Sequence, residues 1–308
     1  MQADIQIKNI TKFSKGLSDI NGINLDIKTG DVIGIIGPEG SGKTSLIRLL
    51  TTYHTPDSGD ILINNKSIYQ NIEEYKSNLG YLPKTNPLYD NMTVVGFLEL
   101  MAQMCNVPKF LRATRVIDII RICKLNAVKN NIIGDLSKGA KRRVGIAQSI
   151  INNPSILLLD RPTSELDPNQ AKKIRLLLQD LFKGRTVILC SQSIEDITEL
   201  CTRIIYLRKG EIIADINRND MLDENDENSI IKLQIAPVSQ QRAIKEINTI
   251  ENIDRAEVID DYIYIYSKKD KQVEQDIFDI CCQNEWYIRS LIPVELTIEE
   301  IIKKHLIN

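Results

Sequence analysis

"VIGIIGPEGSGKT", residues 32 to 44, decides the fold of this chain. The apolar run at 32–36 is typical of a buried strand, and residues 37–44 satisfy the pattern G-x-x-x-x-G-K-[ST] at the start of the helical segment 45–50. In such a loop the glycines let backbone N–H groups turn toward phosphate oxygens, and the helix N-terminus adds positive potential. A glycine-rich turn without a ligand is the alternative, but the strand, loop and helix together favour a nucleotide phosphate site.

The loop residues have distinct expected roles. Lys43 supplies a mobile positive charge for the β and γ phosphates, and the Thr44 hydroxyl is placed to hold Mg²⁺. The candidate nucleotide-binding residues of this segment are Gly37, Pro38, Glu39, Gly40, Ser41, Gly42, Lys43, Thr44 and Ser45.

A second apolar strand ends on a carboxylate. "SILLLD", residues 155–160, delivers Asp160 after five apolar or small residues, where a carboxylate reaches Mg²⁺ directly or through water. Thr44 and Asp160 are therefore the candidate metal ligands, and the two motifs together predict a site for ATP and Mg²⁺.

The pattern of apolar residues predicts an α/β core of the P-loop NTPase kind. Residues 1 to about 82 alternate short apolar strands with turns, and residues from about 85 to 150 have the apolar spacing of a helical insert. The strands 155–160 and 186–191 flank the helical segment 168–182, which is the βαβ order of a parallel sheet covered by helices.

An acidic, polar run, "NRNDMLDENDENS" at 217–229, is the best candidate for a domain boundary, because such a run is solvated rather than packed. We therefore assign residues 1–220 to a nucleotide-binding domain and residues 221–308 to a small C-terminal α+β domain for dimer contact or regulation. The segments after the boundary are expected to form a strand, a helix, a pair of strands, a helix, a strand and a helix at 297–306. That order predicts a split βαβ, ferredoxin-like domain.

Two features of the C-terminal part concern its core. "DDYIYIYS", residues 260–267, alternates acidic or aromatic with apolar residues and predicts a half-exposed strand. Trp286 and Tyr287 are expected in a core or an interface rather than in a ligand cage.

Composition excludes several classes of protein. The net charge is −2, from 39 basic and 41 acidic residues, so no global positive field indicates nucleic acid or an anionic membrane as a partner. The longest apolar runs are far shorter than the roughly 18 to 20 residues that span a bilayer, and the N-terminus lacks an apolar signal core. We expect a cytosolic chain unless a membrane partner holds it.

The cysteines do not indicate a metal site. The six cysteines include no CxxC pair, and the only histidines are His54 and His305. Reduced cysteines that act as small buried apolar groups are the expectation.

Further motifs carry a resemblance to a known family. "LSKGAKRRVGIAQSI" at 136–150 looks like the LSGGQ signature and its following helix, and "SELD" at 164–167 looks like the D-loop. With the phosphate loop, these segments resemble the nucleotide-binding subunits of ABC transporters over roughly residues 3–220. "TPDSGDILI" at 55–63 and "LGYLPKTNPLYDNMTV" at 79–94 are most similar to subunits of bacterial drug-exporter and gliding-motility transporters. Such subunits often carry a small C-terminal domain that ends in a helix.

The resemblance implies a head-to-tail dimer that holds two nucleotides at its interface. Ser137 and Gly139 of one chain then contact the nucleotide of the other, whereas the residues alone indicate only a helix cap. Phe13 stands where an aromatic ring stacks on adenine, and its alternative role is to pack the first strand.

Three positions depart from the family's hydrolytic pattern. Arg161 replaces the glutamate that follows Asp160, and a guanidinium cannot accept a proton from water. Lys84 replaces the glutamine or glutamate of the loop near Mg²⁺, and Gln192 replaces the switch histidine. Each substitution taken alone has another explanation. Arg161 could pair with an acidic residue, Lys84 could point to solvent, and Gln192 could replace the histidine without loss of function. Together they predict a degenerate site with no certain catalytic residue.

The predicted function is therefore that of an ATP-binding subunit of a membrane exporter or remodelling complex, with weak or absent hydrolysis at its own site. The nucleotide is either ATP with Mg²⁺ or ATP with a weakened metal requirement. The resemblance implies transmembrane subunits on separate chains, docked by the helical insert including 89–104, and a cytoplasmic location at the inner face of the cell membrane. A homodimer and a heterodimer with a second ATP-binding subunit both stay open. A soluble ATP-dependent switch is the alternative function, and a nucleic-acid-associated ATPase lacks the basic arm or tandem module that it usually needs.

Overall fold

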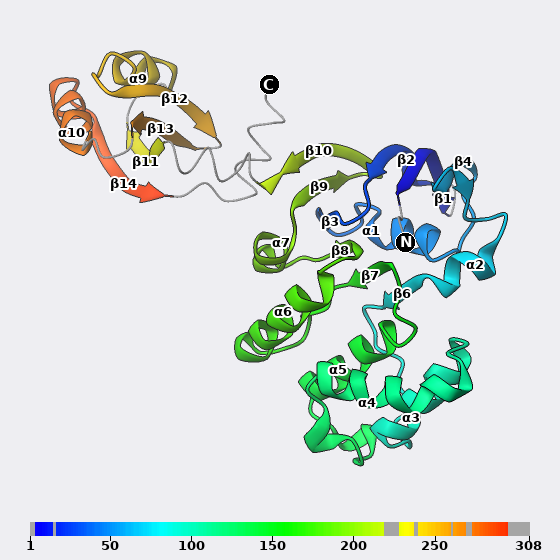
Figure 1. The fold of residues 1–308 in the computed structure, drawn as a ribbon. Helices are drawn as coiled ribbons and strands as arrows, with labels where there is room; N and C mark the ends of the chain where they lie inside the picture. Colours follow the sequence, from blue (N-terminus) through cyan, green and yellow to red (C-terminus); the bar gives the residue numbers. More distant parts are fainter. Residues whose placement is uncertain are drawn as a thin grey trace. The chain divides into compact units, whose positions relative to one another are not determined.

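The computed structural model describes residues 4–14, 17–218, 228–236, 240–259, 261–268 and 273–294. The chain divides into two compact units, Met1–Asp215 and Ile216–Asn308 (Figure 1). Most of the acidic run that suggested a boundary, and the helix expected at 297–306, lie outside the described residues. The assignment of one unit to nucleotide binding and of the other to regulation stays a prediction.

The first unit contains two sheets and the helices that surround them. Its strands are β1 (Ile5–Ser14), β2 (Leu17–Ile27), β3 (Val32–Ile36), β4 (Ser58–Ile63), β5 (Lys66–Ser67), β6 (Leu79–Leu82), β7 (Ile156–Asp160), β8 (Thr186–Cys190) and β9 (Arg203–Arg208), and β10 (Glu211–Asn217) continues into the second unit. The α-helices are α1 (Lys43–Leu50), α2 (Ile72–Ser77), α3 (Val94–Met104), α4 (Arg112–Ile122), α5 (Lys138–Ser149), α6 (Pro168–Phe182) and α7 (Ile194–Leu200), with short 3-10 helices at Lys109–Leu111, Asn126–Val128 and Ile133–Asp135.

The larger sheet has the strand order β10-β9-β3-β8-β7-β6, and its central strands pair in parallel. The strands β3, β7 and β8 are buried along their whole length, as expected for a parallel sheet with both faces covered. The predicted parallel α/β core is confirmed.

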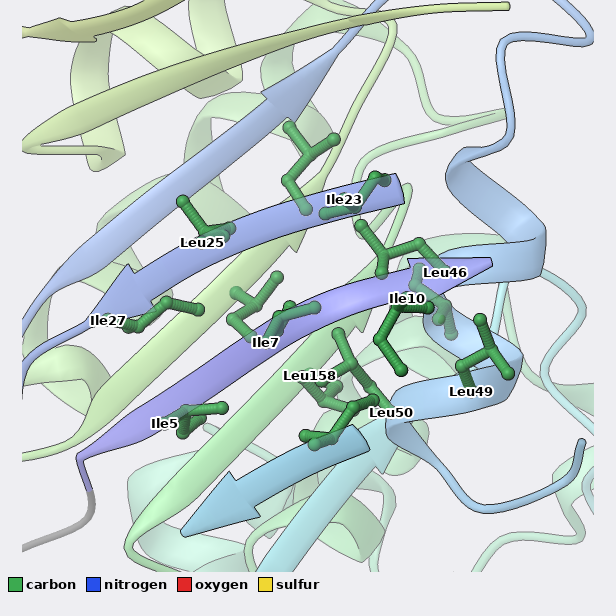
Figure 2. Packing of buried hydrophobic residues seen from close by; sticks show 14 of the residues in the cluster. Ile5, Ile7, Ile10, Ile23, Leu25, Ile27, Leu46, Leu49, Leu50 and Leu158 are labelled. Atoms are coloured by element: carbon green, nitrogen blue, oxygen red, sulfur yellow. The ribbon is translucent and has the colours of Figure 1, made fainter. Parts of the chain in front are cut away.

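The smaller sheet has the order β2-β1-β4-β5, and its main strands pair antiparallel. Figure 2 shows its apolar face, where Ile10 of β1 lies beside Leu46 and Leu49 of helix α1. The labelled side chains are Ile5, Ile7, Ile10, Ile23, Leu25, Ile27, Leu46, Leu49, Leu50 and Leu158, and all belong to one buried cluster. This cluster also includes Ile33 and Ile35 of β3, so α1 is fixed by packing on both sheets.

The predicted helical insert corresponds to α3, α4 and α5, which gather beside the sheets in Figure 1. Helix α3 buries Val94, Phe97, Leu98 and Met101, which follow the i, i+3, i+4, i+7 spacing of an amphipathic helix. It packs against α4 and α5, and α5 also lies against β6 and α6. Through α5, the insert contacts the strand and helix that border the candidate nucleotide site.

The second unit contains a four-stranded antiparallel sheet of order β12-β13-β11-β14. Its elements are β11 (Asn228–Ala236), α9 (Gln240–Ile247), β12 (Ile253–Ile259), β13 (Tyr262–Lys268), α10 (Glu274–Gln283) and β14 (Tyr287–Val294). This element order and strand order are those of the expected split βαβ arrangement. Trp286 packs in the core of the unit, whereas Tyr287 is 75% exposed.

The expectation that the strand at 260–267 is half-exposed is wrong. Both Tyr264 and Tyr266 are only 1% exposed. Cations cover their rings, since Lys232 Nζ lies 5.3 Å from the ring centroid of Tyr264 and Arg255 Cζ lies 4.3 Å from that of Tyr266. The alternation marked the two faces of the sheet correctly, but an alternating pattern does not show whether the second face is covered.

Candidate functional site

Four strands of the larger sheet end side by side at one edge. The last residue of β6, Leu82, pairs with Leu159, and Asp160 of β7 pairs with Cys190, the last residue of β8. Ile35 of β3 also pairs with Cys190. Because these strands are parallel, the segments that follow them leave from the same edge. The phosphate loop therefore shares this edge with the segments that carry Lys84, Arg161 and Gln192.

The phosphate loop needs glycine at both of its ends. Gly37 has a φ of 151°, and a Cβ there would lie 2.0 Å from the carbonyl oxygen of Leu207. Gly42, which precedes α1, has a φ of 102°, and a Cβ there would lie 2.5 Å from the carbonyl oxygen of Asp19. These conformations and contacts allow the loop to pass close to neighbouring backbone while it turns into the helix.

Lys43 is held against the loop that precedes it. Its ammonium group donates hydrogen bonds to the carbonyl oxygens of Gly37 and Pro38, each at 2.7 Å, and to the Ser41 hydroxyl at 2.9 Å. The side chain is buried, and burial lowers the pKa of Lys43. A phosphate that binds to this ammonium group competes with three existing hydrogen bonds.

The two hydroxyl residues that follow have different surroundings. Thr44 is exposed at the first turn of α1, as a metal or phosphate ligand must be. The Ser45 hydroxyl donates a 3.0 Å hydrogen bond to Asp19 Oδ2 and fixes α1 to β2. In this structure the side chain of Ser45 therefore has a structural partner.

Asp160 is 6% exposed at the end of β7. Burial raises the pKa of its carboxyl group, and the positive charges of nearby Arg161, Lys84, Arg142 and Lys43 oppose that shift, the first two most strongly. These residues come from four different segments, so the sheet edge brings several cations around one carboxylate.

The side chains at this edge fit Mg²⁺ only in part. Mg²⁺ is commonly held by one or two carboxylates together with substrate phosphates and water. Asp160 and Thr44 meet the minimum, with phosphate oxygens supplying the rest. Within the described segments no cluster of three or more His, Cys, Asp or Glu residues is placed to hold a metal, and the side chains at 84 and 161 are cations rather than ligands.

The backbone at Arg161 is fixed by its neighbours. Its φ is 50°, in the left-handed region, and its N–H donates to the carbonyl oxygen of Cys190 at 2.7 Å. Its own carbonyl oxygen accepts hydrogen bonds from the N–H and the hydroxyl of Ser164, at 3.1 and 2.9 Å. The backbone at this position is therefore held by three hydrogen bonds, none of which uses the Arg161 side chain.

The side chains of Lys84, Arg161 and Gln192 make no hydrogen bond or ion pair with any described residue. Lys84 and Gln192 are exposed, and Arg161 is half-buried. The alternative in which Arg161 pairs with an acidic residue is therefore not found in the described part of the chain, whereas Lys84 does reach solvent. All three remain available to a ligand at the sheet edge.

Arg142 of α5 joins two of these segments and was not predicted as a site residue. Its guanidinium donates to the carbonyl oxygens of Pro83 and Lys84, at 3.3 and 3.2 Å, and to the Ser164 hydroxyl at 3.1 Å. The same hydroxyl donates to the carbonyl of Arg161. The sequence offers no signal for this role, because Arg142 is one of several basic residues after the signature motif and only the fold buries it.

Asp196 joins the segments that follow β7 and β8, and it was also missed. It is fully buried, and its Oδ2 accepts hydrogen bonds from Thr163 at 2.5 Å and from Ser191 at 2.8 Å. Its Oδ1 lies 3.4 Å from Arg175 Nη1. In the sequence, Ser193 and Asp196 match a helix capping box, and Ser193 does cap α7. The segments after β7 and β8 are therefore fastened to each other through one buried carboxylate.

The residues expected to serve a second nucleotide lie at the start of α5. The Ser137 hydroxyl accepts a hydrogen bond from the N–H of Ala140 at 3.3 Å, so it caps the helix, and it remains exposed. Gly139 is buried, and a Cβ there would lie 2.9 Å from the Gln170 side chain. Phe13 on β1 is 54% exposed, so it does not serve as a core residue. Contact of these three residues with nucleotide stays a prediction.

Comparison with known proteins agrees with this geometry. A family described as "ABC transporter" matches residues 20–164. The chain is 32% identical to the methionine import ATP-binding protein MetN 2 of Acinetobacter baylyi over 68% of this chain and 64% of that protein. It is 33% identical to MetN 3 of Bacillus cereus, over 71% and 69% of the two chains. The Nod factor export ATP-binding protein I of Cupriavidus metallidurans is 27% identical over 72% of this chain and 74% of its own length.

A solved structure has the same fold over the matched region. The ATP-binding cassette MJ0796, in a dimeric post-hydrolysis state bound to ADP and Pi, superposes with a TM-score of 0.62 at 27% identity. The match covers 70% of this chain and 98% of that one. The described residues of the chain contain no helix that is long and apolar enough to cross a membrane.

Proposed function

The chain belongs to the ATP-binding subunits of ABC transporters, and on that premise we propose that it binds ATP at a dimer interface and hydrolyses it slowly or not at all at its own phosphate loop. Gly37 to Ser45 hold the phosphates, with Lys43 as the charged contact, and Phe13 stacks on the adenine. Ser137 and Gly139 of the partner chain complete the site. Thr44 and Asp160 are the residues that hold Mg²⁺ when the metal is bound.

The observation that carries this proposal is the side chain at position 161. A hydrolytic site needs a group beside the γ-phosphate that orients or deprotonates water. Arg161 follows the buried Asp160 directly and is always protonated, so it cannot accept that proton. Loss of general-base catalysis typically slows a reaction by about 10² to 10⁴. Gln192 and Lys84, at the same edge, offer no carboxylate or imidazole in its place.

The partners follow from the family. ATP-binding subunits of ABC transporters work with transmembrane subunits and dimerise. We place this chain at the inner face of the cell membrane, with α3 and the segment 89–104 toward transmembrane subunits on separate chains. The similarity of residues 79–94 to exporter subunits supports an export or remodelling complex. A heterodimer with one competent and one degenerate site and a homodimer with two impaired sites both agree with the proposal.

Hydrolysis and affinity measured side by side test the proposal. The wild-type chain is expected to bind ATP and to show negligible steady-state turnover, and Lys43→Ala is expected to lose binding. Arg161→Glu restores a carboxylate next to Asp160 and is expected to raise turnover by at least about tenfold, a fraction of the 10² to 10⁴ that a general base supplies. Phosphate release and equilibrium ATP binding are the two measurements.

A matched control is Arg121→Glu, which makes the same change of charge on the exposed surface of α4, where the Arg121 side chain is 74% exposed. This variant is expected to leave binding and turnover unchanged. Turnover of the wild-type chain at ordinary transporter rates that Lys43→Ala abolishes would show that the site is not degenerate.

A further inference from the structure

The sheet edge that holds Asp160 carries an excess of positive charge. Lys43, Lys84 and Arg161 contribute three cations, and Asp160 is the buried carboxylate among them. Glu39, which also acts on Lys43, is exposed on the loop. Arg142 adds a fourth cation, but its guanidinium already donates to the carbonyl oxygens of Pro83 and Lys84 and to the Ser164 hydroxyl.

Two of these cations are free to move toward a ligand. The side chains of Lys84 and Arg161 have no hydrogen-bond or ion-pair partner among the described residues, and each follows a strand that ends at the same edge of the sheet as β3. A guanidinium has five donors that match phosphate oxygens, and an ammonium group has three. Both groups can therefore neutralise the β and γ phosphates directly.

These cations have the opposite effect on a metal ion. A divalent cation near Asp160 is repelled by Lys84 and Arg161, which also compete with it for the carboxylate. The ligands that would offset that repulsion are few, since the chain supplies only the Thr44 hydroxyl and Asp160. Uncomplexed ATP carries about four negative charges at neutral pH and the magnesium complex about two, so an edge rich in cations favours the free nucleotide.

From this arrangement we infer that the site takes uncomplexed nucleoside triphosphate, with Lys84 and Arg161 supplying the charge neutralisation that Mg²⁺ supplies in a hydrolytic site. The inference rests on the proposed ATP binding and names the form of the nucleotide. It also accounts for retention without turnover, because the two residues that neutralise the phosphates can neither coordinate Mg²⁺ nor activate water.

ATP binding in excess EDTA and in excess Mg²⁺ tests the inference. The wild-type dissociation constant, measured by calorimetry on the full chain, is expected to differ by less than about threefold between the two conditions. The double variant Lys84→Gln/Arg161→Glu is expected to lose about tenfold or more in affinity in EDTA, because charge-assisted hydrogen bonds to phosphate are lost. Most of that loss is expected to be recovered when Mg²⁺ is added.

The matched control is Lys109→Gln/Arg121→Glu, which makes the same changes of charge on exposed residues of the helical insert. It is expected to bind as the wild type does in both conditions. Because neither Lys84 nor Arg161 makes a side-chain hydrogen bond within the described structure, the test variant is expected to keep the wild-type circular dichroism spectrum and unfolding midpoint. The single variants Lys84→Gln and Arg161→Gln provide the same comparison if the double variant does not fold.

The outcomes separate this inference from the proposed function. No ATP binding in either condition contradicts the proposed function itself. ATP binding in Mg²⁺ that weakens tenfold or more in EDTA for the wild-type chain overturns the inference and leaves ATP binding intact. The inference is also overturned if the test variant binds ATP as tightly as the wild type does, both in EDTA and in Mg²⁺. Lys84 and Arg161 would then contribute nothing to ATP affinity.

Discussion

Two segments of the candidate site are held together by the carboxylate of one residue, Asp196. It accepts hydrogen bonds from Thr163, three residues after Asp160, and from Ser191, next to Gln192. It also forms an ion pair with Arg175. The same arginine pairs with two further acidic residues of α7, both of which are exposed. A fully buried carboxylate with three partners is costly to remove, because the donors that it satisfies are left without an acceptor.

Asp196→Ala is expected to lower the free energy of unfolding of the first unit by about 3 kcal/mol. The reason is that two buried hydroxyl groups and the Arg175 Nη1 group lose their acceptor. Chemical denaturation measures the change. The matched control is Glu195→Ala, which removes the neighbouring partner of the same arginine, 3.0 Å away and 71% exposed. That control is expected to cost less than about 1 kcal/mol. Equal losses for the two variants would contradict a special role for Asp196.

At the residue scale, the sequence predicts contacts that lie within one segment. Gly37, Lys43 and Thr44 are recognisable because the spacing of one short loop fixes their roles. Arg142 and Asp196 are not recognisable, since each acts on atoms that are distant in the chain, such as the carbonyl of Lys84 or the hydroxyl of Thr163. Whether a charged residue is buried depends on tertiary packing, which no local pattern records.

Helix α5 connects the helical insert to the sheet edge. The Asn86 side chain donates to the carbonyl of Lys141 on this helix at 2.7 Å, and Arg142 holds the carbonyls of Pro83 and Lys84. Gly145 leaves room for Asn86, since a Cβ there would lie 2.3 Å from the amide oxygen. The segment that follows β6 is therefore anchored along one face of α5.

Arg142→Met keeps an unbranched, flexible side chain and removes its hydrogen-bond donors. It is expected to lower the free energy of unfolding by about 2 kcal/mol and to speed amide hydrogen exchange in the segments that follow β6 and β7. The control is Lys141→Met, one residue away, whose 3.4 Å ion pair with Asp90 is on the surface. It is expected to change stability by less than about 0.5 kcal/mol. Unchanged exchange in Arg142→Met would show that other contacts hold these segments.

At the element scale, long periodic segments were predictable and short ones were not. The apolar spacing of α3 and α6 and the continuous apolar runs of β7 and β8 identify those elements correctly. Helix α2 was missed because it has only six residues and one buried side chain, Tyr75, so it lacks a repeating apolar face. Its sequence signal is the cap, in which Asn71 accepts from the N–H of Glu74 at 3.2 Å.

At the scale of the whole molecule, each of the two compact units has a hydrophobic cluster of its own among the described residues. One core surrounds α1 between the two sheets of the first unit, and the other includes Ile265, Ile277 and Trp286 of the second unit. The polar composition around 217–229 suggested a boundary within a few residues of the division between Asp215 and Ile216. The composition does not indicate the function of the second unit, because the apolar residues that fill its core serve packing and are not specific to any ligand.

Calorimetry of the full chain is expected to show two unfolding transitions, because each core unfolds with its own unit. ATP at about 100 times its dissociation constant is expected to stabilise only one of them, by about 2.7 kcal/mol. Trp286→Ala, which removes a 7% exposed side chain from the second core, is expected to weaken the other by about 3 to 5 kcal/mol. A single transition that moves with both changes would contradict independent units.

The loops that meet at the edge of the larger sheet are held by atoms other than their own distinctive side chains. Arg142, Ser164 and the carbonyl of Cys190 keep the backbone at 84 and 161 in place. Exchange of the side chains at 84 and 161 is therefore expected to have little effect on folding, because their own atoms make none of these contacts. On such a scaffold, the side chains presented to a ligand can differ while the backbone that presents them keeps its hydrogen bonds.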